Sequence, residues 1–153
     1  MTRKVLGFVG GAILSLGLVV SAVQADDSRW SIDAEGVITD SRTGLQWHVG
    51  PNNVDWDEAE SYCQNLNVAG GGWRMPTLEE LRGLYTGGEN WDSHQSLPPV
   101  FKGKELDLGW VWSSEAVDSS SMWLFYFYQG EEHWHYRDVS NEFGRVFAVR
   151  SSG

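Results

Sequence analysis

Two histidines and the carboxylates around them are the residues with the clearest potential for metal chemistry. His133 and His135 are separated by one residue, so on a β-strand both imidazoles would lie on the same face. Glu131, Glu132 and Asp138 flank them. Two imidazoles and one carboxylate are ligands that suit zinc or copper, which makes His133, His135 and Asp138 a candidate metal site. Short patterns of this kind are common by chance, and the alternative is a solvated strand face.

A second group of polar residues has the ligand types that calcium prefers. Glu89, Asn90 and Asp92 offer hard oxygen atoms. They belong to residues 86–109, which contain few apolar residues and which we interpret as a long ordered loop. Long loops of this kind often carry function. The segment lacks EF-hand spacing, so calcium is a cofactor that the sequence leaves open.

Aromatic side chains are the third group of candidate functional residues. They make up 13% of the chain and include nine tryptophans, so they must fill a core or form a binding face. The flat face of such a ring stacks on the apolar face of a sugar. Because alternate strand residues point to opposite faces, only about half of these rings can point outward. The candidate ligand-binding residues are Trp91, Trp110, Trp123, Tyr126, Tyr128 and Trp134.

Catalytic motifs are scarce in this sequence. It contains no Gly-x-Ser-x-Gly elbow, and its single cysteine has no histidine at a spacing typical of a known enzyme family. One cysteine also excludes an internal disulfide and a multi-cysteine zinc site. We therefore expect a binding protein and not an enzyme. An envelope enzyme with an unrecognised site and a purely structural accessory domain are the alternatives.

The first 25 residues have the features of a secretory signal peptide. Arg3 and Lys4 precede an uncharged apolar stretch over residues 5–20, and Val23-Gln24-Ala25 provides small residues for cleavage. The alternative is an uncleaved membrane anchor. Cleavage after Ala25 would leave residues 26–153 as a single domain without a membrane span. We expect that domain in the periplasm or outside the cell.

The charge of the remaining chain excludes one class of partner. Removing residues 1–25 takes away two basic residues, so the net charge changes from −10 to −12. Without a basic stripe to neutralise phosphates, the domain is not expected to bind nucleic acid.

Cys63 falls on the apolar face of a predicted helix, where burial is expected. Pairing of Cys63 between two chains is the alternative.

Local patterns predict the elements that position these residues. Asp55 with Glu58, and Thr77 with Glu80, are capping boxes that each begin a helix. Extended structure is expected at 30–47 with a turn at 40–44, followed by a loop at 50–53. Further strands are expected at 110–114, 122–128, 133–136 and 145–150, with turns at 130–132 and 141–144. The predicted fold is α+β, with two helices packed on an antiparallel sheet and a long loop at 86–109.

Five segments, in order, resemble the Lcl C-terminal domain family over about residues 36–151. This is a bacterial family named for the C-terminal domain of a collagen-like adhesin. The resemblance implies a C-type-lectin-like fold and a role in binding a glycan or an envelope protein. The segments are Asp40-x-x-Thr43-Gly44-Leu45-x-Trp47, Trp56-x-x-Ala59-x-x-Tyr62-Cys63-x-x-Leu66, Gly72-Trp73-Arg74-Met75-Pro76-Thr77-x-x-Glu80-Leu81, Trp112-Ser113-Ser114 and Val146-x-x-Val149-Arg150.

Two departures limit what the resemblance implies. The resemblance implies a second cysteine before the last Val-Arg, paired with the helix cysteine, whereas Ala148 occupies that position here. The adhesin is associated with sulfated glycosaminoglycans, but a domain with charge −12 would repel such polyanions.

A second resemblance is to formylglycine-generating enzymes, which have a stretch similar to Trp73-Arg74-Met75-Pro76-Thr77. The copper-binding cysteine pair of those enzymes is absent here.

The motif residues are expected to be structural. Arg74 is placed to form a fork with Glu80 and so hold the preceding loop to the helix. The hydroxyls of Ser113 and Ser114 are expected to bind neighbouring backbone at the end of a strand. The structural set is Trp73, Arg74, Pro76, Thr77, Glu80, Trp112, Ser113, Ser114 and Arg150.

Overall fold

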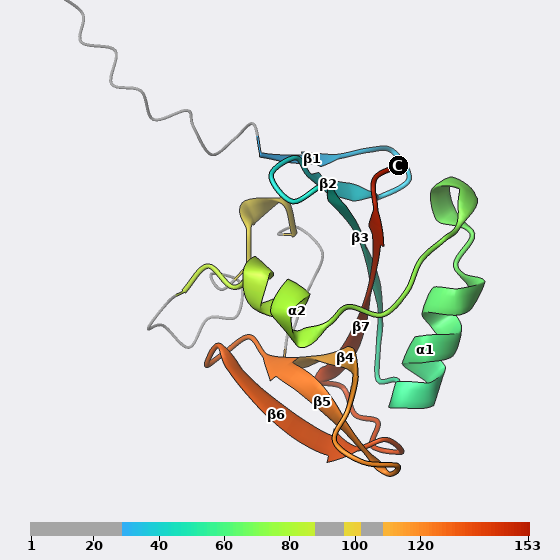
Figure 1. Cartoon of the computed structure of the whole chain (residues 1–153), viewed down its shortest axis with the longest axis vertical. Helices are drawn as coiled ribbons and strands as arrows, with labels where there is room; N and C mark the ends of the chain where they lie inside the picture. Colours follow the sequence, from blue (N-terminus) through green and yellow to red (C-terminus); the bar gives the residue numbers. More distant parts are fainter. Residues whose placement is uncertain (1–28, 88–96, 102–108) are drawn as a thin grey trace, which may run out of the picture.

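The computed structural model describes residues 29–87, 97–101 and 109–153. Within these ranges the chain forms two α-helices and one seven-stranded sheet, an α+β fold that is mostly sheet (Figure 1). The helices are α1 (Trp56–Asn65) and α2 (Leu78–Leu84), with short 3-10 helices η1 (Val68–Gly70) and η3 (Pro99–Phe101). The strands are β1 (Trp30–Ile32), β2 (Ile38–Asp40), β3 (Leu45–Asn52), β4 (Trp110–Ala116), β5 (Ser121–Tyr126), β6 (Glu131–Tyr136) and β7 (Gly144–Ser151).

The sheet is mixed, so the prediction of a purely antiparallel sheet was wrong. The strand order is β1-β2-β3-β7-β4-β5-β6. The last strand, β7, lies between β3 and β4, and it runs antiparallel to β3 but parallel to β4. Periodicity shows which residues share a face of a strand, but it does not show where a strand inserts in the sheet.

Both faces of the sheet are buried at its central strand β7, because one helix packs on each face there. On one face, Trp56, Ala59 and Cys63 of α1 pack with Val146 and Ala148 of β7. On the other face, Leu81 and Leu84 of α2 pack with Phe147 and Val149 of β7. Residues 145–150 therefore form part of a strand, as predicted, and the two helices lie on opposite sides of β7 (Figure 1).

Both predicted capping boxes are present. Asp55 accepts a hydrogen bond from the backbone N–H of Glu58, and the Glu58 side chain accepts one from the Asp55 N–H. Thr77 and Glu80 make the same reciprocal pair at the start of α2. These caps satisfy N–H groups that the first helical turn leaves without partners.

Some strand boundaries differ from prediction. Strand β3 continues through Asn52, where a loop was expected, because it pairs with β7 as far as Arg145. Strand β5 ends at Tyr126, two residues early, and β6 begins at Glu131, inside the expected turn. The turn lies at 127–130, where Gly130 has φ +70° and its position would not accommodate a Cβ beside Tyr85.

Candidate functional site

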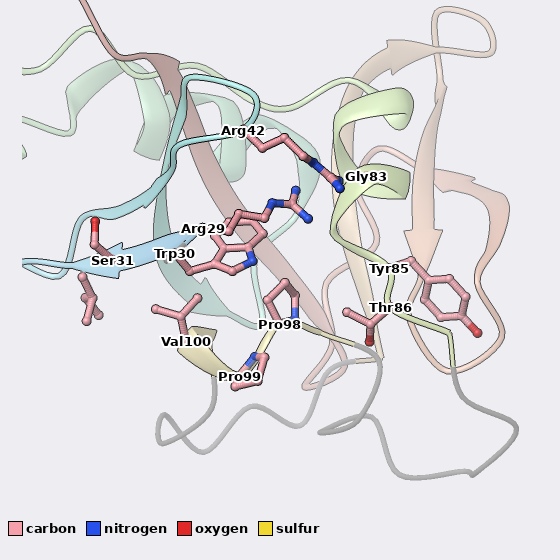
Figure 2. Close-up of a pocket in the computed structure, with 11 residues that line it drawn as sticks. Arg29, Trp30, Ser31, Arg42, Gly83, Tyr85, Thr86, Pro98, Pro99 and Val100 are labelled. Atoms are coloured by element: carbon pink, nitrogen blue, oxygen red, sulfur yellow. The ribbon is translucent and has the colours of Figure 1, made fainter. Parts of the chain in front are cut away.

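A cleft of about 690 Å³ is present on the surface of the described residues. It lies between β1, the C-terminal end of α2 and the segment around η3 (Figure 2). Its apolar lining includes Trp30, Tyr85 and the sequence Pro98-Pro99-Val100, and its polar lining includes Arg29 and Arg42. Aromatic and apolar walls with a few polar groups are typical of a small-molecule site.

The buried carboxylate of Asp40 organises one wall of this cleft. Asp40 is 2% exposed and accepts hydrogen bonds from Arg29 Nε at 2.7 Å and Nη2 at 2.6 Å. It also accepts from the Thr43 hydroxyl at 2.9 Å and the Arg42 backbone N–H at 3.0 Å. Burial raises the pKa of Asp40, but these hydrogen bonds outweigh it and hold the pKa below its usual value. The anionic carboxylate thus fixes the β2–β3 turn and the Arg29 guanidinium.

The fixed Arg29 in turn orients Trp30. The Arg29 guanidinium lies 4.4 Å from the centre of the Trp30 ring, and Trp30 packs edge-on against Phe101 of η3 at 5.9 Å. Trp30 is half-buried, so it rests on the core and still offers surface to the cleft. On the opposite side, Tyr85 packs edge-on against Phe125 at 6.0 Å. These contacts hold the two aromatic walls in place without a ligand.

Arg42 provides an exposed cation at this cleft. Figure 2 shows its side chain extending toward Gly83, beside the guanidinium of Arg29. A second cavity of about 510 Å³ shares Arg29, Arg42 and Gly83 with the first and continues along α2 toward Glu79. The two cavities therefore form one extended groove in which Arg42 lies at the junction.

The motif around Arg74 forms a structural connection, as its residues suggested. Arg74 donates to Glu80 through Nη1 at 2.9 Å and Nη2 at 2.6 Å. Burial raises the pKa of Glu80, but hydrogen bonds from Arg74 and Thr77 outweigh it and lower the pKa overall. The hydrogen bonds from Arg74 to Glu80 raise the pKa of the guanidinium. The pair joins the segment after the glycine run to the start of α2, and Pro76 in that segment accepts from the Ser114 backbone N–H at 2.8 Å.

Trp112, Ser113 and Ser114 connect β4 to the helices. Trp112 Nε1 donates to the carbonyl of Val54 just before α1 at 3.0 Å, and Trp56 Nε1 donates to the carbonyl of Ser113 at 2.8 Å. The Ser113 hydroxyl donates to the Trp123 carbonyl at 2.9 Å. The Ser114 backbone N–H donates to the carbonyl of Pro76, which precedes α2.

Arg150 holds the glycine-rich segment against β7. Its guanidinium lies 4.3 Å from the centre of the Trp73 ring and donates to the carbonyls of Ala69 at 2.9 Å and Gly71 at 2.5 Å. A further bond at 2.8 Å joins it to Gln46. Trp73 is 5% exposed, so this arginine covers a buried ring.

The predicted aromatic ligand residues are dispersed over the molecule. Trp91 lies outside the described residues. Trp110 is 3% exposed and belongs to the core, while Tyr126 and Tyr128 are half-buried. Half-buried Trp123 and exposed Trp134 are directly opposite each other on β5 and β6. Tyr136, which is not among the predicted ligand residues, packs edge-on against Trp134 with 5.7 Å between the ring centres.

Two of the three predicted metal residues, His133 and His135, lie on the same strand, but their rings contact other side chains. His133 and His135 lie opposite Leu124 and Met122 on β5, and therefore on one face, as expected. His133 Nε2 is 3.2 Å from Glu131, and the His135 ring lies 4.8 Å from Trp110. Burial, and then the nearby His133, lower the pKa of His135. In the described ranges no three His, Cys, Asp or Glu residues, Asp138 included, form a group that could hold a metal ion. The calcium candidates Glu89, Asn90 and Asp92 lie outside those ranges.

The residues that line the cleft were not among the candidates predicted from the sequence. Arg29 and Trp30 lie at the start of β1, Arg42 lies in the β2–β3 turn and Tyr85 follows α2, so their proximity depends on tertiary packing. The available signal was the aromatic Trp30 beside Arg29, together with Pro98-Pro99 in a segment expected to be functional.

The chain belongs to the Lcl C-terminal domain family, whose model matches residues 36–150. That family indicates an adhesin-like C-terminal domain. No curated protein matches the chain. The matched range begins after β1, so Arg29 and Trp30 lie outside it. The family match alone therefore does not account for the cleft. Among the helices of the described segments, none is long and apolar enough to cross a membrane.

Proposed function

We propose that this protein is an exported binding domain of the bacterial cell envelope that recognises a glycan in the cleft beside Trp30. The observation that carries the proposal is the cleft of about 690 Å³ with a half-buried tryptophan and two arginines at its wall. The Trp30 ring supplies a face for stacking on a sugar, and Arg42 supplies N–H donors for sugar hydroxyls. Because Asp40 pairs with Arg29, the cleft is less basic than two arginines alone would make it.

A glycan array tests this proposal with and without calcium. The purified protein is applied once with calcium and once with EDTA, together with Trp30→Ala and Arg42→Ala. Each variant is expected to weaken binding about tenfold, because each removes one contact of the proposed site. Phe143→Ala is the matched control, since it removes an exposed aromatic ring outside the cleft and outside β6.

The pattern of hits discriminates between the modes of recognition. Hits that survive EDTA and are lost in Trp30→Ala support stacking in the cleft. Hits that need calcium support a role for residues 86–109. A blank array under both conditions contradicts glycan binding and favours an envelope protein as the partner. Binding that Trp30→Ala and Arg42→Ala leave unchanged places the glycan elsewhere.

The proposal includes export and a C-type-lectin-like fold. Export is supported by the signal-peptide pattern of residues 1–25, and cell fractionation with N-terminal sequencing should find a mature chain that begins at Asp26. A cytoplasmic protein that still begins at Met1 would contradict it. The fold proposal rests on the family resemblance and on the α+β architecture. An experimental structure superposed on C-type lectin domains tests it.

A further inference from the structure

Strand β6 forms an open edge of the sheet. It pairs with β5 on one side, and no other described strand lies beyond it (Figure 1). It is six residues long, whereas β1 at the opposite edge has three, and it contains no proline. Natural edge strands are usually short, bulged or interrupted by proline, because a regular edge can pair with another chain. The edge of β6 is therefore suited to strand addition.

The backbone of β6 presents hydrogen-bonding groups to this edge. The Arg137 N–H donates to the Ser120 carbonyl at 2.9 Å, which identifies residues 120 and 137 as a hydrogen-bonded pair. Hydrogen-bonded and non-hydrogen-bonded pairs alternate along an antiparallel ladder. Given the register of β6 on β5, Glu132 and Trp134 occupy non-hydrogen-bonded pairs. Their N–H and C=O groups consequently point away from β5, toward the open edge.

The side chains along this edge leave apolar surface in water. Trp134 is 47% exposed and Tyr136 is 57% exposed, and their rings are in edge-on contact. Trp123 lies opposite Trp134 on β5 and is half-buried. A strand added to β6 would cover part of these rings while pairing the backbone groups.

Charges at the two ends of β6 favour a second copy of the same strand as the partner. Glu131 and Arg137 have opposite charges and are each three residues from Trp134. If two β6 strands pair antiparallel with Trp134 opposite Trp134, Glu131 of each copy faces Arg137 of the other. That register also aligns the outward backbone groups of Trp134 in both copies. Arg137 already pairs with Asp57 at the start of α1, so the added carboxylate would extend an existing ion pair.

We propose that the protein forms a two-fold symmetric dimer by antiparallel pairing of β6, centred on Trp134. The two sheets join into one continuous sheet, and the glycan clefts beside β1 lie at its two far ends. This arrangement would present two copies of the cleft, which strengthens binding to a surface that carries repeated ligands. The pairing itself does not depend on what the cleft binds.

Sedimentation velocity over a range of protein concentrations at 0.15 M salt tests the dimer and its register. Glu131→Arg places two arginines opposite each other at both ends of the interface, and Arg137→Glu places two glutamates there. Each variant alone is expected to weaken dimerisation about tenfold. An equimolar mixture of the two is expected to restore it as a heterodimer. In that heterodimer the introduced arginine faces the introduced glutamate at one end, and the native Glu131 faces the native Arg137 at the other.

Matched variants control for net charge and for folding. Glu35→Arg makes the same charge change in the β1–β2 hairpin, far from β6 in the strand order, and should leave the dimer unchanged. Trp134→Ala should weaken it without touching the ion pair of Arg137 with Asp57. Circular dichroism checks that each variant is folded.

Three outcomes overturn the proposal. One is a wild-type protein that stays monomeric at the highest concentration. Another is a dimer that Glu131→Arg and Trp134→Ala leave unchanged, which would place the interface on another face. The third is loss of dimer in both charge variants with no recovery in their mixture, which would exclude the stated register.

Discussion

Arg74 donates two hydrogen bonds to the carboxylate of Glu80, at 2.9 and 2.6 Å, and the same carboxylate caps α2 through the Thr77 N–H. The Glu80 side chain therefore joins the segment after the glycine run to the first turn of α2. The Arg74 side chain is 49% exposed while that of Glu80 is 17% exposed, so water weakens the pair but does not replace it.

Glu80→Gln should lower the free energy of unfolding by about 1 kcal/mol at neutral pH, because it keeps a capping oxygen but loses the charged fork. Since the pKa of Glu80 is lowered in the folded protein, its contribution is complete above the unfolded pKa and is lost as pH falls through the folded pKa. The difference from wild type should therefore shrink below about pH 4. Urea unfolding at several pH values measures it.

The exposed neighbour Glu79 supplies the control for this change. Glu79→Gln removes a carboxylate from the same helical turn without removing the fork, and its effect should stay within about 0.5 kcal/mol. An equal loss in both variants would attribute the effect to the helix dipole and not to Arg74.

Cys63 should be inert toward thiol reagents in the folded protein. It is 1% exposed, and burial raises the pKa of its thiol to about 12, so almost no thiolate exists at pH 8. A thiol titration should detect one cysteine in guanidinium and none in native buffer. Gln64→Cys adds an exposed thiol on the next residue and should react at once. Rapid native labelling of Cys63 would contradict the burial.

Ala148→Cys should create a disulfide with Cys63. Both residues belong to one buried cluster, and the Cys63 sulfur lies 3.9 Å from the carbonyl of Phe147, the residue before Ala148. Closing so long a loop should raise the free energy of unfolding by about 2–4 kcal/mol. Thiol counting under denaturing conditions should find no free cysteine before reduction and two after it. Two free thiols without reductant would show that the geometry does not permit the bond.

Gly130→Ala should destabilise the protein more than Gly72→Ala. Both glycines have positive φ, +70° and +80°, which is strained for alanine. A Cβ at Gly130 would lie 2.5 Å from the Tyr85 ring, whereas a Cβ at Gly72 meets no described atom within 4 Å. We expect a loss of about 1 kcal/mol at Gly72 and about 2–3 kcal/mol at Gly130. Thermal unfolding compares the two, and equal losses would mean that Tyr85 moves aside freely.

Local patterns of residues were sufficient to predict the individual elements of this fold. Asp55 with Glu58 and Thr77 with Glu80 marked the starts of both helices, because a capping box involves only residues within one turn. Residues 145–150 were predicted as a strand and lie within β7, because the side-chain period of a strand is a local property. The fork between Arg74 and Glu80 was also evident, since six residues separate them.

The way in which these elements meet depends on packing between distant parts of the chain. The parallel pairing of β4 with β7 and the burial of Trp110 follow from strand order, which residue periodicity does not encode. The cleft depends on tertiary packing too. Arg29 and Trp30 line the same cleft as Tyr85 only once β1 has joined the sheet and α2 has packed on it. Local hydrogen bonds set the elements, whereas long-range burial of apolar surface set their arrangement and therefore the candidate site.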